Sequence, residues 1–225
     1  KLNAQSDLYT YFYIRGLRLL NSTGIQTYIC SNSWLDVGYG TWLQEFLLKR
    51  CSIDCIIDNH NKRSFKADVN TIISVINAPR KRVIEDNIVK FVAFKLPFEE
   101  CIFTENLLKI ENAAKQERNN VLKIYPITIK ELLKIGTESK DEDERNLGVG
   151  KYIGDKWGAK FLRAPDIYNV LVLRNGKNLT KLEDIADVIT GCYSGINDFF
   201  YLDNNRANTL KIEKKYLVPI IRNSE

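Results

Sequence analysis

Helical and strand patterns alternate along the first part of the chain, and this alternation predicts an α/β fold. Apolar residues recur at helical spacing over residues 6–20 and 41–50, whereas β-rich runs occupy residues 25–30, 53–58 and 69–78. The link between the last two runs is so short that an antiparallel hairpin is the simplest connection. The predicted order is therefore helix, strand, helix, strand, strand, with a hairpin at the end.

Signals at the ends of these segments support the assignment. Ser6 or Asp7 can cap the first helix, and the polar run of residues 21–24 (NSTG) ends it. Gly38 and Gly40 frame the turn before the second helix. Beyond the hairpin, the pattern predicts a strand over residues 88–95 and helices over residues 105–116, 128–135 and 166–173.

The pattern of residues changes at Gly176, where short apolar segments begin to alternate with turn residues. We therefore expect a second domain from this point, truncated by the end of the chain. Four glycines at positions 148, 150, 154 and 158 precede it. They follow no convincing strand and lack the lysine–serine pair of a phosphate loop, so we interpret them as a flexible linker.

The composition is that of a globular protein. Of the 225 residues, 44% are hydrophobic and 27% charged, which excludes disorder, collagen and a disulfide scaffold as descriptions of the whole chain. No apolar run approaches the roughly 18 residues of a membrane span, and no signal peptide is visible, so we expect a cytoplasmic protein without a membrane partner. Because the chain has no methionine and begins with Lys1, we also expect an internal fragment of a longer protein.

Basic residues gather in one segment of the chain. The sequence has 33 basic and 28 acidic residues, a net charge of +5, which permits a nucleic-acid partner without requiring one. Between positions 62 and 82 a single acid, Asp68, faces six basic residues: Lys62, Arg63, Lys66, Arg80, Lys81 and Arg82. This segment is either a nucleic-acid surface or an ordinary exposed hairpin.

The cysteines do not form a recognisable site. They are Cys30, Cys51, Cys55, Cys101 and Cys192. Their odd number and the absence of a secretory signal favour reduced thiols. Cys51 and Cys55 are four residues apart, but no second pair follows, and the single histidine, His60, does not complete a zinc site. We therefore expect no metal site. A catalytic cysteine paired with His60 is a weaker alternative function for these thiols.

Two groups of segments resemble known enzymes. Residues 6–12 (SDLYTYF), 24–35 (GIQTYICSNSWL) and 63–71 (RSFKADVNT) resemble the helix, strand and hairpin after the Asn-Pro-Pro-Tyr loop of S-adenosylmethionine-dependent DNA amino-methyltransferases. The later segments resemble a TaqI-like specificity domain; they are residues 157–165 (WGAKFLRAP), 182–188 (LEDIADV), 191–195 (GCYSG) and 217–223 (LVPIIRN). In this order, the segments are similar to the large single-chain restriction–modification enzymes of type II G.

The resemblance implies a more specific fold and activity. The fold would be the C-terminal half of a Rossmann-like methyltransferase sheet ending in an antiparallel hairpin, followed by the start of a mixed α+β target-recognition domain. Residues 1–98 would form the second half of the catalytic domain, residues 99–175 a helical connecting region, and residues 176–225 the truncated recognition domain. The activity would be methyl transfer from S-adenosylmethionine to the 6-amino group of a flipped adenine in double-stranded DNA.

One departure from the family pattern changes this expectation. The sequence contains neither Asn-Pro-Pro-Tyr nor the glycine-rich cofactor loop that precedes it in the family, and no nuclease carboxylate–lysine cluster is identifiable. We therefore expect no catalytic residue in this chain and no activity from it alone. It would act with the remainder of the same polypeptide, and magnesium would be needed only if the parent protein also carries a nuclease domain.

The resemblance also implies site residues. Phe65 would be the aromatic floor beneath the extruded base, and Phe12 would pack against the adenine ring of the cofactor; for each, packing into the core is the alternative. Beside Phe65, the DNA phosphates would be contacted by Lys62, Arg63 and Lys66. In the second domain, the candidates for contacts with bases or phosphates are Tyr193, Ser194, Asn197, Arg222 and Asn223.

Several alternatives stay open from the sequence. Asn197 and Asn223 could equally be turn residues. Trp34 follows a strand, where it would line a ligand pocket or act as a buried wedge, and Asp7 would cap a helix or orient the active-site loop. For the whole chain, the alternatives to an enzyme fragment are a non-catalytic DNA-binding specificity module and an α/β domain that binds another protein.

Overall fold

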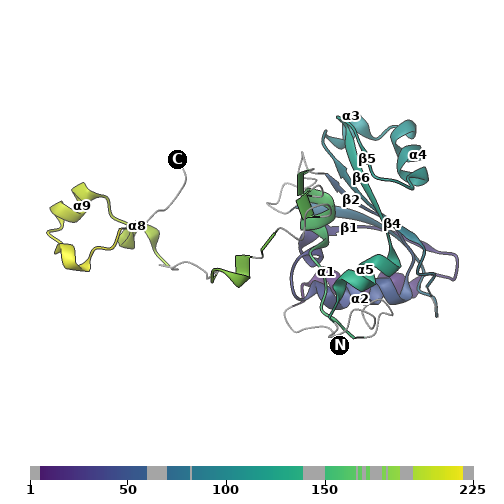
Figure 1. Cartoon of the computed structure of the whole chain (residues 1–225), viewed down its shortest axis with the longest axis horizontal. Coiled ribbons are helices and arrows are strands. Elements are labelled where there is room, and N and C mark those ends of the chain that lie inside the picture. The colour runs from purple at the N-terminus through teal and green to yellow at the C-terminus, as the bar shows by residue number, and fades with distance from the viewer. Residues whose placement is uncertain are drawn as a thin grey trace. The chain divides into compact units, whose positions relative to one another are not determined.

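Figure 1 shows the computed structural model of the chain. It describes residues 6–59, 70–81, 83–138, 150–165, 167–168, 171–172, 179–180, 182–187 and 195–219. The chain forms two compact units, Lys1–Arg174 and Asn175–Glu225. None of the helices in the described part of the chain is both long enough and apolar enough to cross a membrane.

A six-stranded sheet runs through the first unit (Figure 1). Its strands are β1 (Ile25–Ser31), β2 (Ile53–Asn59), β3 (Thr71–Asn77), β4 (Ile88–Phe94), β5 (Glu117–Arg118) and β6 (Leu122–Thr128). The order across the sheet is β1-β3-β2-β4-β6-β5. Strands β2 and β4 run parallel, whereas the other pairs described in this sheet are antiparallel. A separate two-stranded sheet joins β7 (Thr137–Glu138) to β8 (Lys151–Tyr152).

The predicted hairpin is present. Strands β2 and β3 are antiparallel, with Asp58 opposite Ile72. Strand β3 lies between β2 and β1, so that Thr71 at its start is opposite Ser31 at the end of β1. The prediction of an α/β fold with an antiparallel hairpin is thus confirmed, and the sheet as a whole is mostly antiparallel.

Helices cover the two faces of the sheet. One face packs against α1 (Leu8–Leu19), α2 (Gly40–Arg50), α5 (Ile129–Gly136) and the π-helix η2 (Gly158–Arg163). The other packs against α3 (Phe98–Cys101) and α4 (Thr104–Asn112), which Figure 1 shows on the opposite side of the sheet from α2 and α5. Adjacent residues of β4 divide between the faces: Phe91 contributes to the first core and Val92 to the second. This division follows from the two-residue period of a strand.

Helix α1 begins where the sequence predicts, but it buries other residues than the apolar ones that predicted it. Asp7 is its N-cap residue, and its side chain accepts a hydrogen bond of 2.7 Å from the backbone N–H of Leu8. Leu8, Tyr11, Phe12 and Leu19, whose spacing predicted the helix, are exposed. The buried face is formed by Tyr13, Ile14 and Leu17. The hydroxyl of Tyr13 donates to the Ser74 hydroxyl of β3 at 2.7 Å, so this buried polar group is satisfied and ties the helix to the sheet.

The region between residues 99 and 175 contains more than helices. It supplies β6, whose sequence LKIYPIT includes Pro126 opposite Lys90 of β4. A proline within a strand weakens the sequence signal for that strand, which explains why it was not predicted. The linker interpretation is wrong for residues 151–158, which form β8 and lead into η2. A side chain at Gly158 would collide with the carboxylate of Asp36, so close packing accounts for this glycine; Gly148 lies outside the described residues.

The second unit consists of short elements in its described part. They are η4 (Leu182–Asp184), α8 (Asn197–Phe200), α9 (Asn204–Thr209) and η5 (Lys214–Tyr216). Asp203 caps α9 by accepting a hydrogen bond of 2.7 Å from the backbone N–H of Arg206. Ala207 of α9 is buried, whereas Phe199 and Phe200 are exposed. The assignment of this unit to a target-recognition domain stays a prediction, as do the proposed roles of the three regions.

Candidate functional site

The ends of β1 and β2 and the start of β3 lie side by side at one end of the strands, which is called the sheet edge below. Ser31 closes β1 opposite Thr71, which opens β3. Asn59 closes β2 and lies opposite Phe94 of β4. Next to them, the backbone N–H of Asn32 donates to the carbonyl of Asn70 at 3.0 Å. The segment between Asn59 and Asn70, which includes the predicted base-stacking residue, therefore joins β2 to β3 at this end of the sheet, and Asn70 lies beside the residue that follows β1.

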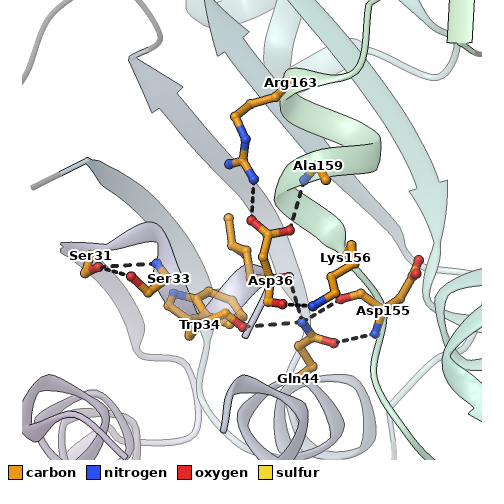
Figure 2. Close-up of polar contacts among 10 residues, drawn as sticks. Ser31, Ser33, Trp34, Asp36, Gln44, Asp155, Lys156, Ala159 and Arg163 are labelled. Carbon is orange, nitrogen blue, oxygen red and sulfur yellow. Dashed lines mark hydrogen bonds and ion pairs between the residues drawn. The ribbon is translucent and has the colours of Figure 1, made fainter. Parts of the chain in front are cut away.

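A tight turn follows the end of β1. It is a 3₁₀ helix, η1 (Asn32–Leu35), whose N-cap is Ser31. The Ser31 hydroxyl accepts a hydrogen bond of 3.3 Å from the backbone N–H of Ser33 and lies 2.9 Å from the Ser33 hydroxyl (Figure 2). Serine caps of this kind satisfy backbone donors that would otherwise be free at the helix start. The turn is thus held by its own side chains.

Trp34 of this turn is a wedge in the core. Its side chain is fully buried and makes edge-to-face contacts with Tyr13 and Trp157, at ring-centroid distances of 5.9 Å to each. Of the two alternatives left open by the sequence, burial is correct, and a place on the rim of a ligand pocket is wrong for this residue. The indole instead joins α1 to the segment that leads into η2.

Asp36 holds the start of η2 against the turn (Figure 2). One carboxylate oxygen accepts a hydrogen bond of 3.0 Å from the backbone N–H of Ala159. The other forms an ion pair with the guanidinium of Arg163, and the Lys156 ammonium donates to the backbone carbonyl of Asp36. A carboxylate at the start of a helix satisfies free backbone donors and complements the helix dipole.

Gln44 joins the same two segments from beneath (Figure 2). Its side-chain nitrogen donates to the carbonyls of Leu35 and Asp155 at 3.1 and 3.0 Å. Its side-chain oxygen accepts from the backbone N–H of Asp155 at 3.1 Å and from the Tyr152 hydroxyl at 3.0 Å. Because Gln44 is buried, these bonds replace water and fix residues 152–155 to the turn after β1.

Sequence reasoning missed this polar network. Asp36 and Gln44 belong to no recognised motif, and the bonds that join the two segments span 108 to 127 positions of the sequence. The repeated close approach of Gly154 to Thr41 and of Gly158 to Asp36 gives those glycines a role. Interpreted as close-packing positions rather than as a linker, these two glycines were the sequence signal for the polar network.

Phe12 is exposed on α1. Its side chain is 62% accessible, and Tyr11 beside it is 48% accessible. The alternative in which Phe12 packs into the core of the described structure is therefore wrong. Asp7 caps the same helix, which was one of its two suggested roles. Its other suggested role, orienting the active-site loop, stays a prediction. The cofactor contact of Phe12 also stays a prediction.

The described cysteines are poor nucleophiles. Burial raises the pKa of the Cys30 and Cys51 thiols to about 12 and that of Cys55 to about 11. These thiols are therefore protonated at neutral pH, and thiolate chemistry requires the deprotonated form. No group of three or more potential metal ligands occurs in the described part of the chain. His60 and Cys192 lie outside it.

Most of the predicted site residues lie outside the described residues. These are Phe65, Lys62, Arg63, Lys66, Tyr193, Ser194, Arg222 and Asn223. Asn197 begins α8, and its side chain is not described. Among the residues to which the resemblance assigns a cofactor, base or phosphate contact, Phe12 is thus the one whose side chain is described.

Two of the three strands at this sheet edge, β1 and β2, fall with the turn after β1 in a part of the chain that matches a known family. The match is to the Eco57I restriction-modification methylase. It covers residues 1–65, which include α1, β1, η1, α2 and β2. The chain is also 23% identical over 222 residues to the Type II methyltransferase M.AccI of Acinetobacter calcoaceticus. That alignment takes in 98% of this chain and 34% of the relative, so the chain spans about a third of the length of the curated protein that it matches.

Two solved structures are similar to the chain. One is the M protein of the type I restriction enzyme EcoKI, with a TM-score of 0.37, 12% identity, and coverage of 69% of this chain and 36% of that chain. The other is the type IIG restriction endonuclease BpuSI, with a TM-score of 0.49, 13% identity, and coverage of 99% of this chain and 24% of that chain.

Proposed function

We propose that this chain is the base-binding part of a site-specific DNA methyltransferase from a restriction–modification system. The observation that carries the proposal is the family match over residues 1–65. It spans the helix and strand that lead to the sheet edge where β1, β2 and β3 meet. The alignment with a Type II methyltransferase over 98% of the chain supports the same assignment. The proposed compartment is the cytoplasm, where such an enzyme meets cellular DNA.

The proposed reaction is transfer of a methyl group from S-adenosylmethionine to the 6-amino group of an adenine. Such an enzyme must take its target base out of the duplex, and an exposed aromatic ring stabilises the extruded base by stacking. We assign this role to Phe65, between Asn59 at the end of β2 and Asn70, the residue before β3. Lys62, Arg63 and Lys66 then contact the phosphates beside it.

Phe12 is the proposed cofactor contact within this chain. An adenine ring stacks on an accessible aromatic side chain, and Phe12 meets that requirement because most of its surface is exposed. When bound, S-adenosylmethionine supplies the methyl group. The contribution of Phe12 is to orient the adenine end of the cofactor, and the other contacts come from the rest of the protein.

The catalytic groups are proposed to lie outside this chain. The sequence contains no Asn-Pro-Pro-Tyr, and β1 is an edge strand that pairs with β3 on one side only in the described sheet. An edge strand presents unpaired backbone groups that a further strand can satisfy. We therefore propose that the sheet continues beyond β1 with a strand from the remainder of the same polypeptide, and that the chain is inactive alone. Magnesium enters the proposal only for a parent that also carries a nuclease domain.

In the proposed recognition domain, sequence-specific contacts come from Tyr193, Ser194, Asn197, Arg222 and Asn223. Side chains of these types donate and accept hydrogen bonds at base edges and phosphates. Replacing one that contacts a base changes the preferred sequence, whereas replacing one that contacts a phosphate weakens binding to all sequences alike.

Radiolabelled methyl transfer tests the proposal. The whole protein and this chain alone are incubated with labelled S-adenosylmethionine and mixed-sequence duplex DNA, and the labelled nucleoside is identified after digestion. We expect 6-methyladenine from the whole protein and no label from the chain alone. Label on cytosine would contradict the adenine assignment, and transfer by the chain alone would contradict the proposed position of the catalytic groups.

A non-catalytic specificity module is the second candidate function. The observation that favours it is the absence of an Asn-Pro-Pro-Tyr sequence from these 225 residues. Under this alternative, the whole protein binds duplex DNA and transfers no methyl group unless a separate subunit is added. Methyl transfer by the purified whole protein would exclude it.

A further inference from the structure

A basic groove lies at the end of β1 that is opposite the candidate site. Its cavity measures about 340 Å³, and six residues line it: Arg18, Phe46, Arg50, Pro79, Arg80 and Lys81. Four of these residues carry a positive charge and none carries a negative charge. The strand between the groove and Ser31 has seven residues, a span of about 20 Å. The groove is therefore separate from the proposed base-binding edge.

Backbone hydrogen bonds hold the groove together. The loop after β3 is tied to the start of β1 by a bond of 2.9 Å from the Ala78 N–H to the Gly24 carbonyl. Two residues later, the N–H of Arg80 donates to the carbonyl of Arg50, the last residue of α2, at 2.7 Å. These bonds hold the backbone of Arg80 beside that of Arg50, so the two side chains start from neighbouring positions.

Helix termini explain only part of this charge. Arg18 and Arg50 lie in the last turns of α1 and α2, where a cation interacts favourably with the helix dipole. Arg80 and Lys81 follow a strand, and no helix end accounts for them. In the described part of the chain, none of the four cations forms an ion pair with a carboxylate. The like charges therefore repel one another until an anion neutralises them.

The lining of the groove also includes two apolar residues, Phe46 and Pro79. Phe46 is half-buried and stacks on Trp42 at a ring-centroid distance of 5.6 Å, and Pro79 lies beside it in the lining. A lining of four cations and two apolar residues suits a ligand with negative charges spaced along an uncharged framework. A sugar–phosphate backbone has this chemistry, because deoxyribose carbons alternate with charged phosphodiester groups.

We propose that this groove binds the phosphodiester backbone of DNA, at a position outside the base pairs read by the recognition domain. The inference rests on the proposed function, because it assumes that DNA is the substrate. The four cations neutralise phosphates and release counterions, and this contribution to binding is independent of sequence. The groove affects how tightly the protein holds DNA and leaves the methyl-transfer step unchanged.

Charge-removing variants of the whole protein test the groove. The variant Arg50→Gln/Arg80→Gln removes two groove cations, and Lys115→Gln/Lys134→Gln removes two exposed cations elsewhere in the same unit. All four side chains are exposed, so the fold should survive, which circular dichroism checks. The affinity for a long mixed-sequence duplex is then measured by fluorescence anisotropy over a series of salt concentrations.

We expect the groove variant to lower the slope of log K against log salt by about 0.9 for each lost phosphate contact. The control variant should leave the slope near that of the wild type, and the value of kcat at saturating DNA should stay unchanged in both. Equal effects of the two variants would overturn the groove proposal and leave the methyltransferase proposal intact. Absence of any DNA binding by the wild-type protein would overturn both.

Discussion

The carboxylate of Asp36 forms an ion pair with the guanidinium of Arg163, 127 residues later in the sequence. The same carboxylate accepts a hydrogen bond from the backbone N–H of Ala159 at the start of η2. One side chain thus joins the turn after β1 to the segment that precedes the second unit. The relationship ties the proposed base-binding edge to the part of the chain that leads into the proposed recognition domain.

Removing the Asp36 carboxylate should destabilise the first unit. Asp36→Ala loses both the helix-start hydrogen bond and the ion pair, and we expect a loss of about 1–2 kcal/mol in the free energy of unfolding. Urea unfolding followed by tryptophan fluorescence measures it. Glu45→Ala is the matched control, because its partner Lys49 is on the same surface helix and the pair is largely exposed; such a pair contributes less than about 1 kcal/mol. Equal losses in the two variants would contradict the role given to Asp36.

Replacing Gln44 by leucine should be more damaging. Leucine has a similar size but leaves the Tyr152 hydroxyl, the Asp155 N–H and the Leu35 carbonyl without their partner. Each unsatisfied buried group costs about 1–3 kcal/mol, so the free energy of unfolding should fall by at least about 2 kcal/mol. Lys49→Gln, an exposed change on the same helix, is the control. A Gln44→Leu variant as stable as the control would show that the network is not required.

The buried thiols should resist modification in the folded protein. Because burial holds the pKa of Cys30 and Cys51 at about 12, few of these groups ionise at pH 8, and access is blocked as well. We expect reaction with a disulfide reagent only after urea unfolding, as measured by the mass of the modified peptides. Rapid labelling of Cys30 in the native protein would contradict the packing of β1.

The same thiols predict a loss of stability at high pH. Their folded pKa is raised above the ordinary value of 9.0, so the unfolded chain releases these protons first. The contribution of the buried thiols to stability is present below pH 9 and is lost as the pH rises from 9 towards about 12. Urea midpoints that rise over this range would contradict this sign, and Cys30→Ser/Cys51→Ser provides the comparison without the thiols.

Replacing Phe12 by alanine should separate cofactor binding from folding. Phe12 is exposed, so we expect a change of less than about 0.5 kcal/mol in the free energy of unfolding. The affinity of the whole protein for S-adenosylmethionine should fall about tenfold, which calorimetry measures, because stacking contributes about 1–3 kcal/mol. Leu19→Ala, an equally exposed residue of the same helix, should leave the affinity unchanged. Unchanged affinity in the Phe12 variant would exclude the cofactor contact.

Local patterns predicted the elements that have strong local signals. The Asp7 cap and the helical spacing of apolar residues identified α1, although most of the residues used for that spacing are exposed. The β-branched runs identified the β2–β3 hairpin. Strand β6 was missed because Lys123 and Pro126 interrupt its run of apolar residues. A strand of this kind forms because β4 is available to pair with it, and that partner is a property of the tertiary structure.

The site was only partly predictable, for a related reason. The sequence placed Trp34 and Phe12 at the right elements, but whether each side chain is buried depends on what covers it. Trp157 covers Trp34 from far along the chain, whereas nothing in the described residues covers most of Phe12. The network of Asp36 and Gln44 arises from contacts across more than 100 residues, which no local pattern encodes.

The most direct test of the central claim is the turnover of the whole protein with Phe65 replaced. If Phe65 stacks on an extruded adenine, Phe65→Ala should lower kcat for methyl transfer to duplex DNA by about 10- to 100-fold, in keeping with the loss of about 1–3 kcal/mol of stacking. Phe65→Trp keeps an aromatic ring and should retain most of the activity. Unchanged turnover in the alanine variant, with the fold intact, would contradict the claim that this chain binds the flipped base.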